Sequence, residues 1–228
     1  MSFIDDPLRY LGSFAGEQRV DVYKSLVGPD IEVSLINGRY QLNAGCVNYS
    51  YGPLHDAFRR YFAKDKPRFV ETDPILILGF GGGSVAVILR EELGFNNPVT
   101  GVELDEAVLN AAYDHFNIDR LKNLEIVRMD AHDYINTCQQ KFALIVIDLY
   151  VDEFVPPVFE STGFLQRVHN CLLPGGKVVF NKLESDEKTR GERIAFETIF
   201  NNIFARCITF KIPVNKQSPN YMITGFAD

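Results

Sequence analysis

The stretch Ile75-Leu-Ile-Leu-Gly79-Phe-Gly81-Gly82-Gly83-Ser84 decides how this chain folds. Its four leading apolar residues predict a short buried strand, and the glycines lead directly into a helical pattern. Glycine allows the backbone to turn tightly and to approach a ligand closely, while the free amides at the start of a helix face that ligand. Since a plain strand-to-helix turn needs only one or two glycines, Gly79, Gly81, Gly82 and Gly83 indicate a ligand-binding loop.

The spacing of these glycines leaves two ligand classes open. Gly81, Gly83 and Ala86 fit the GxGxxG/A pattern of dinucleotide-binding proteins, and Gly79, Gly81 and Gly83 fit the GxGxG pattern of methyltransferase-like nucleoside binders equally well. An NAD-dependent oxidoreductase is therefore one alternative. It is disfavoured because no second phosphate loop is visible in the sequence and because the C-terminal strand pattern suits the methyltransferase-like class better.

Beyond the glycine loop, apolar strands alternate with helical stretches. Strands are predicted at residues 75–78, 99–103, 124–128, 144–148 and 177–181, and helices near 84–93, 105–115, 131–138 and 159–172. This alternation is typical of an α/β fold with a doubly wound, mostly parallel sheet and helices on both faces. A helix over about 188–204 and two strands at 207–213 and 221–226 follow. The short connection between these two strands predicts an antiparallel pair at one edge of the sheet.

The first 63 residues predict a smaller unit. Segments 31–36 and 39–42 alternate around Asn37-Gly38, the dipeptide that favours a type I′ turn, so residues 31–44 should form a β-hairpin. Residues 20–25 are a possible third strand, and residues 54–63 have helical spacing. We divide the chain into this unit (1–63) and a nucleoside-binding α/β domain (64–228). Because a hairpin buries little surface alone, it must pack on the larger domain or on a second subunit, and we expect a homodimer.

Composition and charge exclude several classes of protein. The 228 residues are 46% hydrophobic and 23% charged, as in ordinary globular proteins, and no apolar stretch reaches the roughly 20 residues that span a bilayer. The N-terminus lacks the basic and apolar regions of a signal peptide, so we expect a cytoplasmic protein. With a net charge of -7 and no basic run, a cationic small molecule is a better partner than nucleic acid or a membrane. The four cysteines have no metal-binding spacing, and we predict no metal site.

Acidic residues follow the second and third strands of the predicted sheet. Glu103 closes the second strand, where a carboxylate can accept hydrogen bonds from both hydroxyls of a ribose. Asp105 directly precedes a helical pattern and is better placed to cap that helix. Asp130 and Ala131 follow the third strand. Asp130 could accept a hydrogen bond from the exocyclic amine of adenine or could cap the next helix, and both interpretations stay open.

Asp148 is the residue to which we assign the chemistry. It ends the fourth apolar strand, and residues beyond the carboxyl ends of parallel strands line the ligand crevice, so it should lie beside the glycine loop. A carboxylate that an apolar strand delivers into a cleft is a candidate for binding or deprotonating an amine. Asp152 and Glu153 lie in the loop behind it and are as consistent with solvated charges as with ligands.

With these motifs, residues 75–183 resemble the class I S-adenosylmethionine-dependent methyltransferase fold, and within it the spermidine synthase (aminopropyltransferase) family. The matching stretches are the glycine loop with 89–91 behind it, 102–105, 130–131, 147–148 with 155–157, and 172–176. His55-Asp56 is similar to that family's His-acid pair. The resemblance implies S-adenosylmethionine or its decarboxylated form as cosubstrate, with no metal. It also implies roles for individual residues: Glu103 at the ribose, Asp130 at the adenine and Asp148 near the attacking amine. Our own prediction adds Ala131 to the cosubstrate site and assigns His55, Tyr150 and Asp152 to substrate binding.

The chain departs from that family at three places. The family has an aspartate in the glycine loop, which contacts the amino end of the decarboxylated cosubstrate, where this chain has Gly82. A tyrosine before the histidine is replaced by Leu54, for which Tyr49 or Tyr51 could substitute. The Ser-Asp-Pro sequence after the fourth-strand acid is replaced by residues 149–151. Aminopropyl transfer to a di- or polyamine is our first expectation. Methyl transfer to a small molecule and a nucleoside-binding relative without catalysis are the alternatives.

Overall fold

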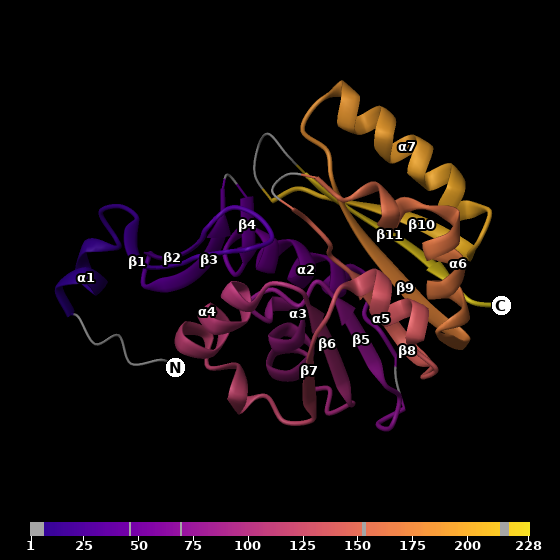
Figure 1. Cartoon of the computed structure of the whole chain (residues 1–228), viewed down its shortest axis with the longest axis horizontal. Helices are drawn as coiled ribbons and strands as arrows, with labels where there is room; N and C mark the ends of the chain where they lie inside the picture. The colour runs from indigo at the N-terminus through magenta and orange to yellow at the C-terminus, as the bar shows by residue number, and fades with distance from the viewer. Residues whose placement is uncertain (1–6, 46, 69, 152–153, 215–218) are drawn as a thin grey trace.

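Two β-sheets organise the residues that the computed structural model describes, which are 7–45, 47–68, 70–151, 154–214 and 219–228. The larger sheet has the strand order β10-β11-β9-β8-β5-β6-β7, and the smaller has the order β1-β2-β3-β4. The smaller sheet extends away from the larger one, and α1 (Pro7–Gly12) lies at its far end (Figure 1).

The larger sheet confirms the predicted doubly wound architecture. Its parallel strands are β5 (Ile75–Leu78), β6 (Val99–Glu103), β7 (Leu124–Arg128), β8 (Phe142–Ile147) and β9 (Leu172–Leu183). β5 pairs with β6 on one side and with β8 on the other, so the chain changes direction across the sheet between these two neighbours. β10 (Ala205–Ile212) and β11 (Asn220–Phe226) form the predicted antiparallel edge, with β11 next to β9.

Both faces of the larger sheet are buried at its centre, because β5 and β8 are apolar throughout. Ile75 and Ile77 pack on the face that carries α2 and α4, whereas Leu76 and Leu78 pack on the face that carries α5, α6 and α7. The helices on these two faces are α2 (Pro53–Lys64), α3 (Ser84–Val87), α4 (Glu106–Phe116), α5 (Ala131–Thr137), α6 (Thr162–Asn170) and α7 (Glu187–Asn201). Successive residues of a central strand therefore pack on opposite faces of the sheet, and both faces are covered by helices. Such a strand needs apolar residues at every position, which is why a near-continuous apolar run predicts a parallel sheet.

Short helical segments account for the differences from the predicted helix bounds. The helix after the glycine loop continues from α3 into a π-helix, η1 (Ile88–Glu92), and a 3₁₀ turn, η2 (Ile118–Arg120), follows α4. A second 3₁₀ turn, η3 (Pro157–Glu160), precedes α6, so the helix predicted from residue 159 begins at Thr162. Side-chain caps begin α4, α5, α6 and α7, at Asp105, Asp130, Ser161 and Asp186.

The smaller sheet contains the predicted hairpin and two elements that the sequence did not predict. β2 (Ile31–Ile36) and β3 (Arg39–Ala44) pair across Asn37 and Gly38, whose φ angles of 50° and 73° are those of a type I′ turn. β1 (Gln18–Tyr23) is the third strand. β4 (Val47–Ser50) and α1 were missed because both are too short to show periodicity.

The smaller sheet shares a hydrophobic core with the larger domain. Ile31, Val33 and Leu42 belong to one buried cluster with Phe58 of α2 and Phe116 of α4. The hairpin therefore packs on the larger domain of its own chain, which is one of the two alternatives that the sequence left open. The domain division at residues 63 and 64 and the homodimer stay predictions. Within the described ranges, no helix is long and apolar enough to cross a membrane.

Candidate functional site

The carboxyl ends of β5 and β8 meet at the point where the sheet topology changes direction. Asp148 N donates to Leu78 O at 2.9 Å, which fixes the start of the segment after β8 against the end of β5. Gly79 has a φ of 81°, and a Cβ on it would lie 2.1 Å from Asp148 O. Only glycine allows this approach, so Gly79 sets the distance between the loop and Asp148.

A cavity of about 670 Å³ opens at this point. Seven of the predicted site residues line it: Gly79, Gly81, Glu103, Asp130, Ala131, Asp148 and Tyr150. Residues 27–29, Ile31, Asn48 and Tyr49 of the N-terminal unit close its other side. Of the remaining candidates, Gly82, Gly83 and His55 are not among the lining residues, and Asp152 lies outside the described residues. The cavity is of the size that holds a small ligand.

Glu103 connects the glycine loop to the end of β6. Its Oε2 accepts a hydrogen bond from Gly81 N at 2.9 Å, and its Oε1 accepts from Leu104 N at 2.9 Å and from Asp105 N at 3.1 Å. Burial raises the pKa of Glu103, and these three backbone donors partly offset that effect. A carboxylate offers about four acceptor sites, and these three donors leave one of them, so a ribose diol that binds through both hydroxyls would have to displace one backbone donor.

Asp130 is the N-cap of α5. Its Oδ1 accepts from His132 N at 2.7 Å and from Asp133 N at 3.4 Å, and the residue also lines the cavity. The capping interpretation is thus correct. Contact with adenine stays a prediction, and it is compatible with the cap because capping occupies one of the two carboxylate oxygens.

Two exposed apolar residues beside these acids were not predicted. Leu104 follows Glu103 and Met129 precedes Asp130; they are 41% and 39% exposed, and both line the cavity. Large apolar side chains at a cavity wall favour contact with a flat, weakly polar group such as a nucleobase. Their positions could have been predicted from the sequence, because each residue lies next to a predicted site acid at the end of a strand.

Asp148 is a carboxyl of the cavity wall whose pKa lies well above its usual range. Burial raises its pKa to about 7, the hydrogen bond from Asn181 lowers it, and the charge of Glu103 raises it. Asn181 Nδ2 donates to Asp148 Oδ1 at 2.9 Å. A carboxyl with a pKa near 7 exchanges a proton readily at neutral pH, which suits a general base. Asn181 was missed, although it is a polar residue at the end of the predicted strand 177–181, and this position is the signal that could have identified it.

Tyr150 forms part of the wall, and its hydroxyl is already engaged. It accepts from Leu183 N at 2.7 Å and donates to Asn181 O at 3.2 Å. Tyr49 reaches the same segment by donating to Tyr150 O at 3.3 Å. Of the two tyrosines proposed to replace the one missing at Leu54, Tyr49 lines the cavity, whereas Tyr51 stacks between His55 and Phe116.

His55 lies behind this wall rather than on it. Its Nε2 is 2.7 Å from Glu92 Oε1, and its ring stacks on Tyr51 with a centroid distance of 5.4 Å. This position attaches α2 to η1. Substrate binding by His55 stays a prediction that no contact with the cavity supports.

The first turn of α7 closes the cavity on the side of β9. Ser185, Asp186, Lys188 and Thr189 line it, and Asp186 and Thr189 form a reciprocal capping box with hydrogen bonds of 2.8 and 3.0 Å. Lys188 is the single basic residue among the described lining residues.

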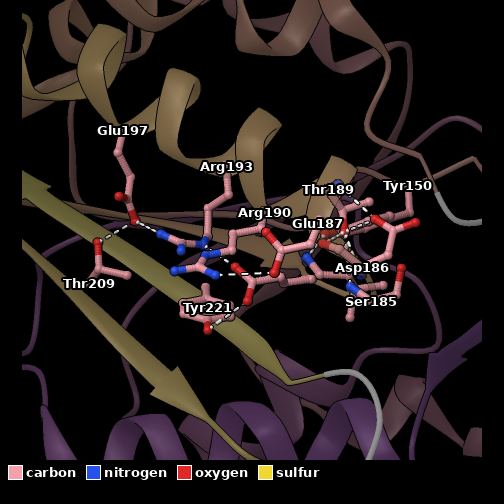
Figure 2. A network of polar contacts seen from close by, with 12 residues as sticks. Tyr150, Ser185, Asp186, Glu187, Thr189, Arg190, Arg193, Glu197, Thr209 and Tyr221 are labelled. Carbon is pink, nitrogen blue, oxygen red and sulfur yellow. Dashed lines mark hydrogen bonds and ion pairs between the residues drawn. The ribbon is translucent and has the colours of Figure 1, made fainter.

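A half-buried ion-pair network fixes the start of α7 (Figure 2). Arg193 donates to Glu184 at 2.7 Å and to Glu197 at 2.6 Å, and its guanidinium lies 4.2 Å from the centroid of the Tyr221 ring. Burial alone would raise the pKa of Glu184, but hydrogen bonds from Arg193 and Tyr221 lower it. Glu184 precedes Ser185 directly, so the network holds the cavity wall from behind.

Asp130, His132 and Asp133 approach one another within 4.8 Å. Exposed acidic clusters of this kind are common without an ion, and Asp130 is occupied as a helix cap. The predicted absence of a metal stays a prediction.

Comparisons with known proteins agree with the fold. Residues 75–176 match the Methyltransferase domain family. The chain is 32% identical over 106 residues to a probable polyamine aminopropyl transferase of Bifidobacterium longum, covering 46% of the chain and 23% of that protein. It is 29% identical over 152 residues to the polyamine aminopropyltransferase of Vibrio vulnificus, covering 65% of the chain and 48% of that protein. The chain thus spans less than half the length of these two relatives.

A solved structure extends the similarity to the N-terminal sheet. The probable spermidine synthase from Corynebacterium glutamicum superposes with a TM-score of 0.73 at 20% identity, covering 91% of this chain and 80% of that one. The chain has a spermidine synthase-like methyltransferase fold. These matches favour the methyltransferase-like interpretation of the glycine loop over the dinucleotide one.

Within this spermidine synthase-like fold, Gly82 is the clearest departure. Its N–H donates to Ser50 Oγ at 2.7 Å, and a Cβ on it would lie 2.9 Å from the Cβ of Ser50. Tyr51 N donates to Ser84 Oγ at 2.7 Å, so the end of β4 lies directly against the loop. The space that an acidic side chain would need at residue 82 is occupied by Ser50.

Proposed function

We propose that this chain binds S-adenosylmethionine or its decarboxylated form and transfers an aminopropyl group from it to a di- or polyamine, with Asp148 as general base. The observation that carries the proposal is the position of Asp148. A carboxyl whose pKa is about 7 lies at the topological switch point, next to the glycine loop and on the wall of the cavity.

The charge of the cavity supports a cationic acceptor. Its described acidic lining residues are Glu103, Asp105, Asp130, Asp148 and Asp186, against Lys188 alone. The whole chain has a net charge of -7. An ammonium group therefore gains Coulomb energy on entering, whereas an anionic acceptor would lose it.

The chemical step requires from the protein only positioning and one proton transfer. A sulfonium is an activated leaving group, so the acceptor nitrogen must be held in line with the C–S bond and freed of one proton. Asp148 takes that proton. The nitrogen then bonds to the carbon on sulfur, and the C–S bond breaks with its electron pair going to sulfur. Methylthioadenosine is the by-product of aminopropyl transfer, and Asp148 later releases its proton to solvent.

Methyl transfer is the second candidate, and the contact between Gly82 and Ser50 favours it. Gly82 supplies no carboxylate to pair with the terminal amine of the decarboxylated cosubstrate, and a side chain at this position would overlap Ser50. The same base and the same cavity would serve an amine that attacks the methyl group, and the by-product would then be S-adenosylhomocysteine.

Mass spectrometry of the reaction mixture distinguishes these functions. The protein is incubated with S-adenosylmethionine or its decarboxylated form, together with putrescine, spermidine or a monoamine. We expect methylthioadenosine and an aminopropylated amine. S-Adenosylhomocysteine would assign methyl transfer instead. Bound nucleoside without either product would identify a relative that no longer catalyses.

Asp148→Asn tests the base. Because it keeps the shape and removes the proton acceptor, turnover should fall about 10²- to 10⁴-fold with little change in nucleoside affinity. Asp119→Asn, at an exposed residue of η2, is the matched control. Equal rates in Asp148→Asn and in the wild type would refute the mechanism.

A further inference from the structure

Two buried asparagines lie in line behind Asp148. Asn181 on β9 is 1% exposed and Asn220 on β11 is 5% exposed. Asn220 Nδ2 donates to Asn181 Oδ1 at 2.9 Å, and Asn181 Nδ2 donates to Asp148 Oδ1 at 2.9 Å. Both amides border the cavity. Buried amides are costly unless they are hydrogen-bonded, so this chain of contacts is a built feature of the site.

The direction of the hydrogen bonds matters because a side-chain amide is a donor at one end and an acceptor at the other. With Asn220 donating to its oxygen, Asn181 must present its NH₂ group to Asp148. If Asn181 were turned over, its oxygen would face the Asp148 carboxylate, and that arrangement favours the protonated acid. The orientation of Asn181 therefore influences whether Asp148 is able to accept a proton.

We propose that Asn220 is a positioning residue, which acts through Asn181 to keep Asp148 in the carboxylate form that accepts the proton of the amine. This inference rests on the proposed role of Asp148. It adds a residue from the antiparallel edge of the sheet, a strand on which the sequence placed no site residue.

The other described polar and charged groups near Asp148 do not donate a hydrogen bond to its carboxylate. Glu103, from β6, acts on Asp148 only through its charge, which favours protonation. The Tyr150 hydroxyl is engaged with Leu183 N and Asn181 O, and Tyr49, from β4, donates to Tyr150 O. Lys188 of α7 lines the cavity, and no hydrogen bond or ion pair within the described residues joins it to Asp148. Across the described residues, Asn181 is the one side chain that donates to the Asp148 carboxylate.

Direct titration of Asp148 tests the proposal without any substrate. The protein is labelled with ¹³C at the aspartate side-chain carboxyl carbons, and the Asp148 signal is assigned by its loss in Asp148→Asn. The midpoint of the Asp148 titration should rise by roughly one pH unit in both Asn220→Leu and Asn181→Leu. Asn181→Leu removes the donor to the carboxylate, and Asn220→Leu removes the contact that orients this donor. Thr224→Val is the control, since this buried residue of β11 donates to Ile208 O instead.

The double variant decides whether Asn220 acts through Asn181. Asn220→Leu should have no further effect on the titration once Asn181→Leu is present. An unchanged midpoint in Asn220→Leu would overturn the proposal, and so would additive shifts in the double variant. If Asn220→Leu does not fold, Asn220→Ser replaces it, since serine is too short to reach Asn181 Oδ1. The titrations use no substrate, so their outcome does not depend on whether the protein catalyses aminopropyl transfer. The positioning role of Asn220 and the proposed function can therefore fail independently.

Discussion

The backbone N–H of Gly82 and the hydroxyl of Ser50 form a 2.7 Å hydrogen bond between the glycine loop and the last residue of β4. Both residues are buried, Ser50 to 1% exposure. The contact joins the N-terminal sheet to the loop that should hold the cosubstrate. It leaves no space for a side chain at residue 82, so the two positions constrain each other.

Gly82→Ala should destabilise the folded protein by about 1–3 kcal/mol, because its Cβ would overlap Ser50 in a packed interior. Ser50→Gly removes the opposing atoms, so Gly82→Ala should cost less in that background. Urea denaturation measures both. Gly191→Ala is the control, since nothing lies near that helical glycine and alanine should be neutral or stabilising there. Additive effects of the two substitutions would show that the contact is not the cause.

Glu103→Gln should weaken binding of methylthioadenosine by about a hundredfold or more. Two charge-assisted hydrogen bonds to the ribose, at about 1.5–3 kcal/mol each, would be reduced to weaker neutral ones. Both oxygens of Glu103 accept backbone N–H groups, and glutamine keeps only one of them as an acceptor, so the stability of the variant is measured by urea denaturation beside its affinity. Isothermal titration calorimetry measures the affinity, with Glu125→Gln, at an exposed residue of β7, as control. Unchanged affinity would remove Glu103 from the site.

Asp148→Asn should change the pH dependence of stability. The folded-state pKa is about 7, whereas an unfolded aspartate has a pKa near 3.9. Between these values unfolding releases a proton, so this carboxyl lowers the stability of the wild type as the pH rises from about 4 to 7. The variant lacks that loss, and its stability relative to the wild type should increase over this window and level off above it.

Urea denaturation at pH 5 and pH 7.5 gives that difference directly. Asp119→Asn, whose carboxylate is exposed, should show no such trend. A constant difference between Asp148→Asn and the wild type at both pH values would mean that the carboxyl titrates normally in the folded protein.

Deletion of residues 1–52 should produce an insoluble or much less stable protein. Ile31, Val33 and Leu42 cover Phe58 and Phe116, and their loss would expose a contiguous apolar surface. Light scattering after gel filtration measures solubility and mass, and the same measurement on the full chain tests the predicted homodimer. A truncated chain that stays soluble, monomeric and equally stable would contradict this prediction.

Local sequence patterns predict the strands, the helices and the position of Asp148 because these depend on the order of elements in an α/β sheet. Apolar runs identify β5, β6 and β8, and the topology of such sheets brings their carboxyl ends together. The caps at Asp105 and Asp130 follow from residue type and position.

Contacts between distant segments are not visible in a single sequence. Asn181 and Asn220 become neighbours only when β11 pairs with β9, and their register decides that they meet beside Asp148. Ser50 meets Gly82 because β4, a strand too short to predict, ends at the glycine loop. Leu104 and Met129 were passed over since apolar residues at strand ends are common.

The insertion of β8 beside β5 also has a consequence for synthesis on the ribosome. β5 can pair with β6 as soon as Glu103 has emerged, but its other edge stays open until Ile147 is available. During that interval the nascent chain presents an apolar strand, Ile75–Leu78, with one row of unpaired backbone groups. Until β8 occupies that edge, this strand is open to pairing with a strand from another molecule, and the risk of such pairing increases with the time that separates the synthesis of β6 from that of β8.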